Sequence, residues 1–163
     1  MNLVGPGPIE VHYEDAARAL EVLPEAVGRW VDLGTGAGFP GVVFAARFTG
    51  AEVALVDSRA RRCAFLEDVL ARARAEGVEV SCCRLETLPE RSFDGVMSRA
   101  LAAPEVMFDH ARRLLRAGGE VVMFVQSGRH VDAPPGFELV ASHRYEVAGK
   151  SRASAVFRWL GET

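Results

Sequence analysis

The stretch WVDLGTGAGFPG, residues 30–41, decides the fold. It joins a short apolar run to a loop with four glycines and one proline. Glycine is used at this density where the backbone turns tightly or approaches a ligand closely. Pro40 suits the first turn of a helix, where its missing N–H costs nothing. The stretch therefore predicts a strand over 29–33, a ligand-binding loop and a helix over 40–48.

Strands and helices alternate outward from this stretch. A helix is expected before it, over 13–27. Behind it we expect strands at 51–57, 78–83, 92–100 and 120–126, with helices at 59–76 and 104–119. Such alternation predicts a parallel sheet with helices on both faces. Two final strands, roughly 138–147 and 152–160, are joined by a short turn and must pair antiparallel. The predicted fold is thus Rossmann-like α/β: a mostly parallel seven-stranded sheet with an antiparallel C-terminal hairpin.

Length and composition set the class of protein. The chain has 163 residues, of which 49% are hydrophobic, and we expect one domain over residues 1–163 with a flexible arm at 1–11. No stretch has the length of a membrane-spanning helix and no secretory signal is visible, so a cytoplasmic protein is expected. The three cysteines lack metal-ligand spacing, and neighbouring Cys82 and Cys83 are expected to be buried thiols in a reducing compartment. No metal and no membrane partner are predicted, and the oligomeric state stays open.

The glycine loop fits two classes of cofactor. Gly36-x-Gly38-x-x-Gly41 matches a dinucleotide fingerprint, with an acidic residue, Asp57, about 20 residues further on. The same loop also contains an acidic residue followed by alternating glycines, Asp32-x-Gly34-x-Gly36-x-Gly38. That is the first motif of S-adenosylmethionine-dependent methyltransferases. In a doubly wound sheet the ligand binds beyond the carboxyl ends of the strands, where the loop lies.

Charge separates the two cofactors. A pyrophosphate about 6 Å from Asp32 would be repelled by roughly 3 kcal/mol per charge at an effective dielectric constant near 20. S-adenosylmethionine instead carries a sulfonium and an ammonium, which Asp32 would favour, and a carboxylate that suits N–H groups near a helix start. Asp57 ends the second strand and would accept hydrogen bonds from ribose hydroxyls in either case. A plain tight turn, with Asp32 as a helix-capping acid, is the alternative without a ligand.

Four further segments carry a resemblance to a known family. They are HYEDAARALEVLP (12–24), LVDSRARRCAFLEDV (55–69), RLETLP (84–89) and FDGVMSRALA (93–102). Together with the glycine loop they resemble the glucose-inhibited division protein B family, the small-subunit rRNA methyltransferases G. That family methylates N7 of a guanine in 16S rRNA. The resemblance runs from about residue 12 to about residue 126.

The resemblance implies S-adenosylmethionine as cofactor, with 16S rRNA or the small ribosomal subunit as partner. It implies cofactor contacts from Gly34 and Phe39 in the loop, from Leu85 and Glu86 after the third strand, and from Arg99 after the fourth. Arg99 is the candidate for positioning the substrate. Guanine N7 has a free lone pair and loses no proton on attack, so no general base is required. Two alternatives stay open. The first is a small-molecule or protein methyltransferase on the same fold, which the net charge of −3 favours, and the second is a non-catalytic cofactor-binding relative.

Overall fold

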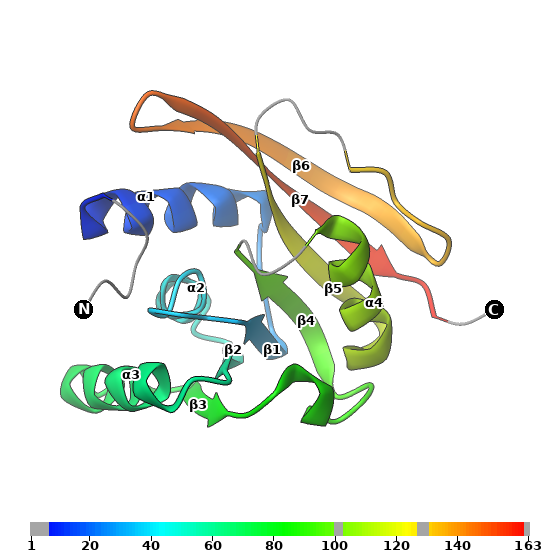
Figure 1. Cartoon of the computed structure of the whole chain (residues 1–163). Helices are drawn as coiled ribbons and strands as arrows, with labels where there is room; N and C mark the ends of the chain where they lie inside the picture. The colour runs from blue at the N-terminus through cyan, green and yellow to red at the C-terminus, as the bar shows by residue number, and fades with distance from the viewer. Residues whose placement is uncertain (1–6, 100–102, 127–130, 162–163) are drawn as a thin grey trace.

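A computed structural model describes residues 7–99, 103–126 and 131–161 of the chain (Figure 1). The helices are α1 (Ile9–Ala19), α2 (Gly41–Arg47), α3 (Ala60–Ala73) and α4 (Pro104–Leu114), with 3₁₀ turns at Leu20–Val22 and Leu85–Thr87. The strands are β1 (Gly28–Leu33), β2 (Ala51–Asp57), β3 (Val78–Cys82), β4 (Phe93–Ser98), β5 (Leu115–Gln126), β6 (Phe137–Val147) and β7 (Lys150–Trp159).

The seven strands form one sheet in the order β3-β2-β1-β4-β5-β7-β6. Strands β1 to β5 pair in parallel, and β7 runs antiparallel between β5 and β6. The predicted architecture is confirmed, including the antiparallel C-terminal hairpin. From β1 the chain moves outward through β2 to β3, and then returns to place β4 on the other side of β1. The carboxyl ends of β1 and β4 therefore mark the switch point at which such sheets bind ligands.

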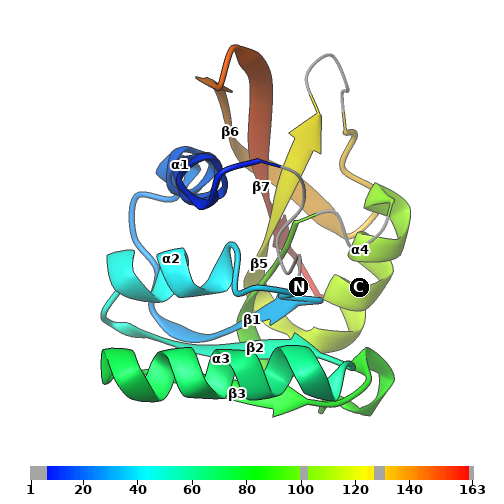
Figure 2. The ribbon, with the colours of Figure 1, turned by 60° about the vertical axis from the view of Figure 1, so that its left-hand side comes forward.

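Helices cover both faces of the sheet. Figure 2 shows α1, α2 and α3 stacked on one face and α4 on the other. Alternate residues of a strand point to opposite faces. In β1, Trp30 accordingly packs in the core beneath α1, α2 and α3, whereas Val31 and Leu33 pack in the core beneath α4. This alternation turns Asp32 toward the start of α2, where its carboxylate meets the N–H of Gly41.

Three boundaries differ from the expectation. Helix α1 begins at Ile9, directly after Pro8 in an extended conformation, so residues 9–11 are helical; residues 1–6 of the expected arm lie outside the described residues. The helix expected over 13–27 ends at Ala19 and is followed by the 3₁₀ turn Leu20–Val22, so residues 23–27 are not helical. Strand β5 begins at Leu115, where we expected helix. Leu115 pairs with Phe93 and is fully buried, and the register then shifts so that Glu120 pairs with Gly95. Gly118 and Gly119 thus lie in an irregular segment of β5. Burial of Leu115 in the strand stabilises this arrangement more than continuation of the helix would.

The expectation of buried thiols at Cys82 and Cys83 is wrong. Cys82 is exposed and Cys83 is half-buried, whereas Cys63 is buried. The reason is the position of β3, which forms an edge of the sheet and pairs only with β2. The sequence of an apolar run does not show whether its strand lies at the edge or in the centre of the sheet.

The other edge of the sheet, β6, is interrupted by a bulge. Leu139 pairs with Phe157 and Ala141 with the next residue, Val156, so that Val140 has no partner on β7. Val140 is 42% exposed.

No helix in the part of the chain that the structure describes is long and apolar enough to cross a membrane.

Candidate functional site

A cleft of about 440 Å³ opens at the carboxyl ends of the parallel strands. Five predicted residues line it: Gly34, Asp57, Leu85, Glu86 and Arg99. They come from four separate segments, each following a different strand. The topology of the sheet therefore brings them together, because carboxyl ends of parallel strands meet at one edge.

The glycine loop forms the wall of this cleft nearest to α2. Gly34, Gly36 and Gly38 have φ values of 66°, 62° and 98°, a region that residues with side chains rarely adopt. A Cβ atom on Gly38 would lie 2.7 Å from Cγ2 of Val42 and 3.0 Å from Cδ2 of Leu66. The loop can thus turn tightly against two helices only with glycine at this position.

Asp57 is held rigidly at the end of β2. Its Oδ2 accepts hydrogen bonds from the N–H of Gly36 at 3.2 Å and from Nη1 of Arg62 at 3.0 Å. Its Oδ1 accepts one from the N–H of Arg59 at 3.0 Å. A carboxylate has about four lone-pair positions, so Asp57 keeps acceptor capacity for a ligand. The residue is 5% exposed, which leaves a small part of it open to the cleft.

Asp32 lies behind the loop and is fully buried. Its Oδ2 accepts hydrogen bonds from the hydroxyl of Thr35 at 2.6 Å and from the N–H of Gly41 at 2.9 Å. Within the described ranges, its Oδ1 has no hydrogen-bond partner. Burial raises the pKa of Asp32 to about 7. Asp32 therefore caps helix α2 through Oδ2, as the alternative without a ligand predicted. Its Oδ1 is buried and forms no hydrogen bond with a described residue.

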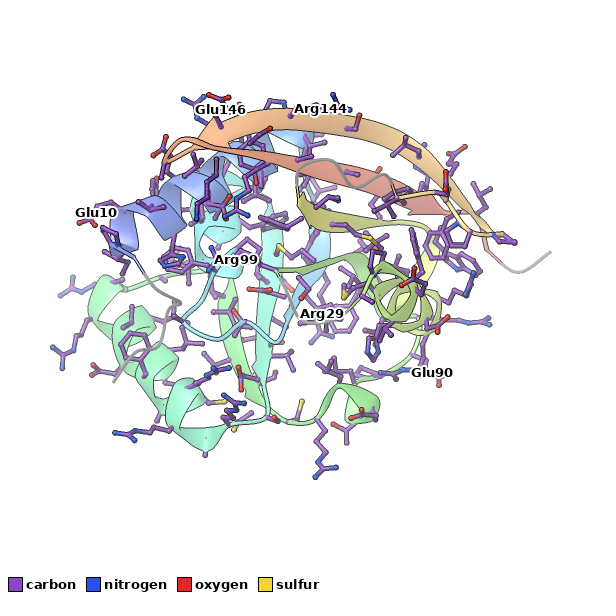
Figure 3. All side chains as sticks on the ribbon, turned by 45° about the horizontal axis from the view of Figure 1, so that its top comes forward. Glu10, Arg29, Glu90, Arg99, Arg144 and Glu146 are labelled. Carbon is purple, nitrogen blue, oxygen red and sulfur yellow. The ribbon has the colours of Figure 1, made fainter. Side chains whose placement is uncertain are left out.

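Arg99 stands at the mouth of the cleft. Its guanidinium carbon lies 5.6 Å from the centre of the Phe39 ring, and its Nη1 lies 3.6 Å from Oδ2 of Asp15 on α1. Figure 3 shows Arg99 between α1 and the glycine loop. Phe39 itself does not line the cleft but packs partly into the core beneath α2. Of the predicted residues, Asp32, Gly36, Gly38 and Phe39 thus support the wall from behind.

Sequence reasoning missed several residues at this site. Arg59, Arg62 and Arg84 also line the cleft, and Asp15 contacts Arg99. Arg62 could have been found, because it follows the strand-end Asp57 by five positions and lies in the first turns of α3. Asp15 lies within the first segment that carries the family resemblance, but no pattern in the sequence predicts a role for it.

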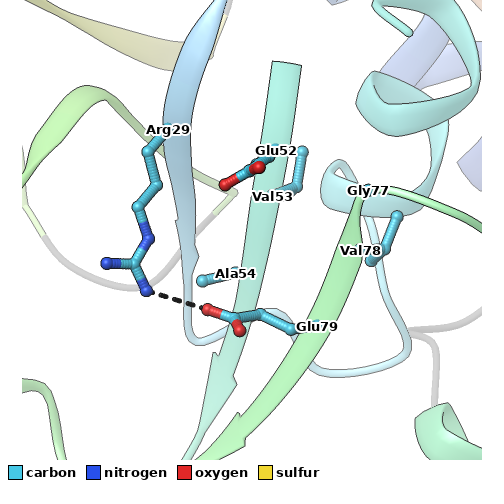
Figure 4. Close-up of a pocket in the computed structure, with 7 residues that line it drawn as sticks. All are labelled: Arg29, Glu52, Val53, Ala54, Gly77, Val78 and Glu79. Carbon is cyan, nitrogen blue, oxygen red and sulfur yellow. Dashed lines mark hydrogen bonds and ion pairs between the residues drawn. The ribbon is translucent and has the colours of Figure 1, made fainter. Parts of the chain in front are cut away.

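A second cleft, of about 420 Å³, lies at the opposite end of the sheet (Figure 4). It is lined by the first residues of β1, β2 and β3, and an ion pair between Arg29 and Glu79 crosses it at 2.9 Å. Ligands of doubly wound sheets bind at the carboxyl ends, whereas this cleft lies at the amino ends. The cleft beside the glycine loop is therefore the candidate site.

Comparison with known proteins relates the chain to one family. The family profile described as GidB, rRNA small subunit methyltransferase G, matches residues 6–132. A ribosomal RNA small subunit methyltransferase G from Methylorubrum populi is 40% identical over 126 residues, which are 72% of this chain and 59% of the relative. One from Carboxydothermus hydrogenoformans is 39% identical over 148 residues, 82% of this chain and 63% of the relative. The chain spans less than two thirds of the length of these relatives.

Solved structures share the fold. A putative methyltransferase, yhhF, from Escherichia coli superposes with a TM-score of 0.69 at 17% identity, over 98% of this chain and 90% of that chain. TrmN from Thermus thermophilus superposes with a TM-score of 0.67 at 18% identity, over 96% of this chain and 55% of that chain. At this level of identity the likeness concerns the architecture alone.

Proposed function

Because the chain belongs to the rRNA small subunit methyltransferase G family, we propose that it transfers a methyl group from S-adenosylmethionine to N7 of a guanine in 16S rRNA. The observation that carries the cofactor assignment is the cleft in which Asp57, the glycine loop, Leu85, Glu86 and Arg99 converge. Family membership carries the assignment of the RNA substrate.

The residues of the site fit this cofactor. Asp57 would accept hydrogen bonds from the ribose hydroxyls, and Leu85 and Glu86 would contact the adenine. The carboxylate of Asp32, buried behind the loop, would favour an ammonium group bound beside it. Loop N–H groups near the start of α2 would receive the carboxylate. S-adenosylmethionine supplies, when bound, a methyl group on a positively charged sulfonium.

The proposed contribution of the chain to the reaction is alignment. Guanine N7 attacks with its own lone pair, so no side chain has to remove a proton. Holding two reactants in line can lower the barrier by about 7–11 kcal/mol. Arg99 would orient the base or a neighbouring phosphate, because its planar guanidinium presents paired donors in a fixed geometry.

Two arginines support an RNA substrate. The side chains of Arg59 and Arg84 line the cleft and are exposed, and neither forms an ion pair with another described residue. Contacts with phosphates position a nucleic acid without reading its sequence. We infer that these two side chains contact the RNA backbone beside the bound cofactor.

The proposal is tested in two steps. Calorimetry with S-adenosylhomocysteine and with NAD decides the cofactor: binding of the first and not of the second is expected, and the reverse would overturn the assignment. Small subunits, or their RNA, from a strain lacking the gene are then incubated with labelled S-adenosylmethionine. N7-methylguanine is mapped by its chemical lability to strand cleavage. Label in a small molecule or in a protein, with none in RNA, would identify a different methyltransferase.

We predict that Asp57→Ala weakens binding of S-adenosylhomocysteine by roughly 1.5–3 kcal/mol, the scale for hydrogen bonds to a charged group. This corresponds to about a 10- to 150-fold rise in Kd. Asp68→Ala is the matched control, since Asp68 is a solvent-exposed aspartate on α3 that pairs with Arg72 on the same helix. Calorimetry gives the affinities, and circular dichroism verifies that both variants fold. An unchanged Kd for Asp57→Ala would show that the ribose is held elsewhere.

We predict that cofactor binding releases a proton from Asp32 below about pH 7. The pKa of Asp32 rises from 3.8 to about 7 on folding, so the folded protein holds a proton there that the unfolded chain has lost. The stabilisation that protonated Asp32 contributes is therefore fully present below about pH 4. As the pH rises toward 7, the free energy of unfolding declines by about 1.4 kcal/mol per pH unit. An ammonium beside Asp32 favours the ionised carboxylate, so affinity for S-adenosylhomocysteine should increase over the same range.

Calorimetry at pH 6 in two buffers with different ionisation heats measures the released proton. Methylthioadenosine is the control ligand, because it lacks the ammonium and should release none. Asp32→Asn should abolish the difference between the two buffers. Equal heats for the wild-type protein in both buffers would place the ammonium away from Asp32.

A further inference from the structure

Asp15 on α1 joins three side chains from distant parts of the chain. Its Oδ2 lies 3.6 Å from Nη1 of Arg99, and its Oδ1 accepts a hydrogen bond from the hydroxyl of Tyr145 at 3.1 Å. Nε of Arg152 lies 3.9 Å from the same Oδ1. The side chain of Asp15 is 16% exposed and that of Arg99 is 20% exposed. The carboxylate thus connects the mouth of the cofactor cleft to the C-terminal hairpin.

The support for Asp15 is rigid. Tyr145 is buried on β6, and its burial together with the nearby Asp15 carboxylate raises the pKa of its hydroxyl, which keeps it a hydrogen-bond donor. At the end of α1, the buried hydroxyl of Ser154 on β7 donates a hydrogen bond to the carbonyl of Ala19 at 2.7 Å. The helix is therefore attached to the hairpin at two points, and Oδ2 of Asp15 is left to face Arg99.

Arg99 needs such a partner to hold one position. It follows β4 at the end of the strand, and its long side chain has many rotamers of similar energy. The Phe39 ring on one side and the Asp15 carboxylate on the other restrict where its guanidinium can lie. The separation of 3.6 Å between Nη1 and Oδ2 is longer than a charge-assisted hydrogen bond, so we expect the main effect of this ion pair to be geometric.

We infer that Asp15 is a positioning residue for methyl transfer, which fixes the guanidinium of Arg99 at the mouth of the cleft. This inference rests on the proposed function, in which Arg99 orients the RNA. It assigns to α1 and the C-terminal hairpin a role in the reaction, although neither lines the cofactor cleft.

A double-mutant cycle tests the inference. Asp15→Asn keeps the shape of the side chain and removes its charge; we expect a fall of about tenfold in the single-turnover rate on small subunits, with the Kd for S-adenosylhomocysteine changed less than twofold. Asp15→Glu should recover part of the rate. In an Arg99→Ala background, Asp15→Asn should have no further effect, since interaction energies vanish when the shared partner is absent. Glu14→Gln, an exposed carboxylate next to Asp15 on α1, is the matched control and should keep the wild-type rate.

A second measurement is independent of RNA. The Nε–Hε signal of Arg99 in NMR relaxation should report an ordered side chain in the wild-type protein and a mobile one in Asp15→Asn. A wild-type protein that methylates no RNA would contradict the proposed function, while the relaxation data would still test the contact. A wild-type rate for Asp15→Asn, an equal loss in the Arg99→Ala background, or an unchanged Arg99 signal would each overturn the inference. If Asp15→Asn fails to fold, the same cycle is carried by Asp15→Glu.

Discussion

Arg99→Ala is expected to reduce the rate of RNA methylation by at least about 100-fold. Displacement of a reacting group by about 1 Å can cost this much, and alignment is the main contribution that we propose for this chain. The loss should fall on the rate at saturating RNA and cofactor more than on the Kd for S-adenosylhomocysteine. Single-turnover methylation of small subunits from a strain lacking the gene measures it. Arg72→Ala is the control, since Arg72 is 79% exposed on α3 and pairs with Asp68 on the same helix.

A lysine at the same position separates charge from geometry. Arg99→Lys keeps the positive charge but loses the planar pair of donors, so an intermediate rate is expected. A wild-type rate for Arg99→Ala would leave the reaction standing and remove the role of this arginine. An equal loss of rate and of cofactor affinity would assign Arg99 to the cofactor instead of the RNA.

Gly95→Ala is expected to destabilise the protein by about 3 kcal/mol, the upper end of the usual cost of overpacking, because a rigid core forces its side chains out of their rotamers. A Cβ atom on Gly95 would lie 2.2 Å from ring atoms of Trp30. The indole cannot move aside: it is 3% exposed, its Nε1–H donates to the carbonyl of Val27 at 3.0 Å, and it packs 4.7 Å from the ring of Phe44. Domains are stable by only about 5–15 kcal/mol, so a large part of the stability is lost.

Urea denaturation followed by circular dichroism measures this effect. Gly50→Ala is the matched control, since the nearest atom to its added Cβ, on Val27, would be 3.8 Å away. We expect its midpoint to stay close to that of the wild-type protein. A wild-type midpoint for Gly95→Ala would mean that Trp30 can repack.

Half of the residues that line the candidate cleft could be predicted from the sequence. Asp57 lies at the predicted end of β2. The alternating glycines form the tight turn that was predicted for them, and their φ values are positive. Leu85, Glu86 and Arg99 were placed only through the family resemblance, and the family profile confirms that resemblance over residues 6–132. They line the same cleft because each follows a parallel strand that ends at the same edge.

What the sequence could not reveal depends on contacts between distant segments. The hydroxyl of Tyr145 and the carboxylate of Asp15 are 130 positions apart, and no periodicity in either segment links them. The exposure of Cys82 depends on which strand lies at the edge of the sheet, and the early start of β5 depends on the burial of Leu115. Local sequence patterns predict helices and strands and which of their faces are apolar. Which other segment packs against each face is decided only when the whole sheet has formed.

The bulge at Val140 has a consequence for pairing between this edge of the sheet and other extended chains. A regular edge strand offers a row of unpaired N–H and C=O groups to any other extended chain, which is the usual route to aggregation through sheets. Leu139 and Val140 are both more than 40% exposed, so a straight β6 would be prone to pair with other extended chains. The extra residue breaks the spacing of those groups and bends the strand, so that a second chain cannot continue the ladder along it. The irregularity in the last hairpin thus protects the sheet at the edge where its apolar side chains are most open to other molecules.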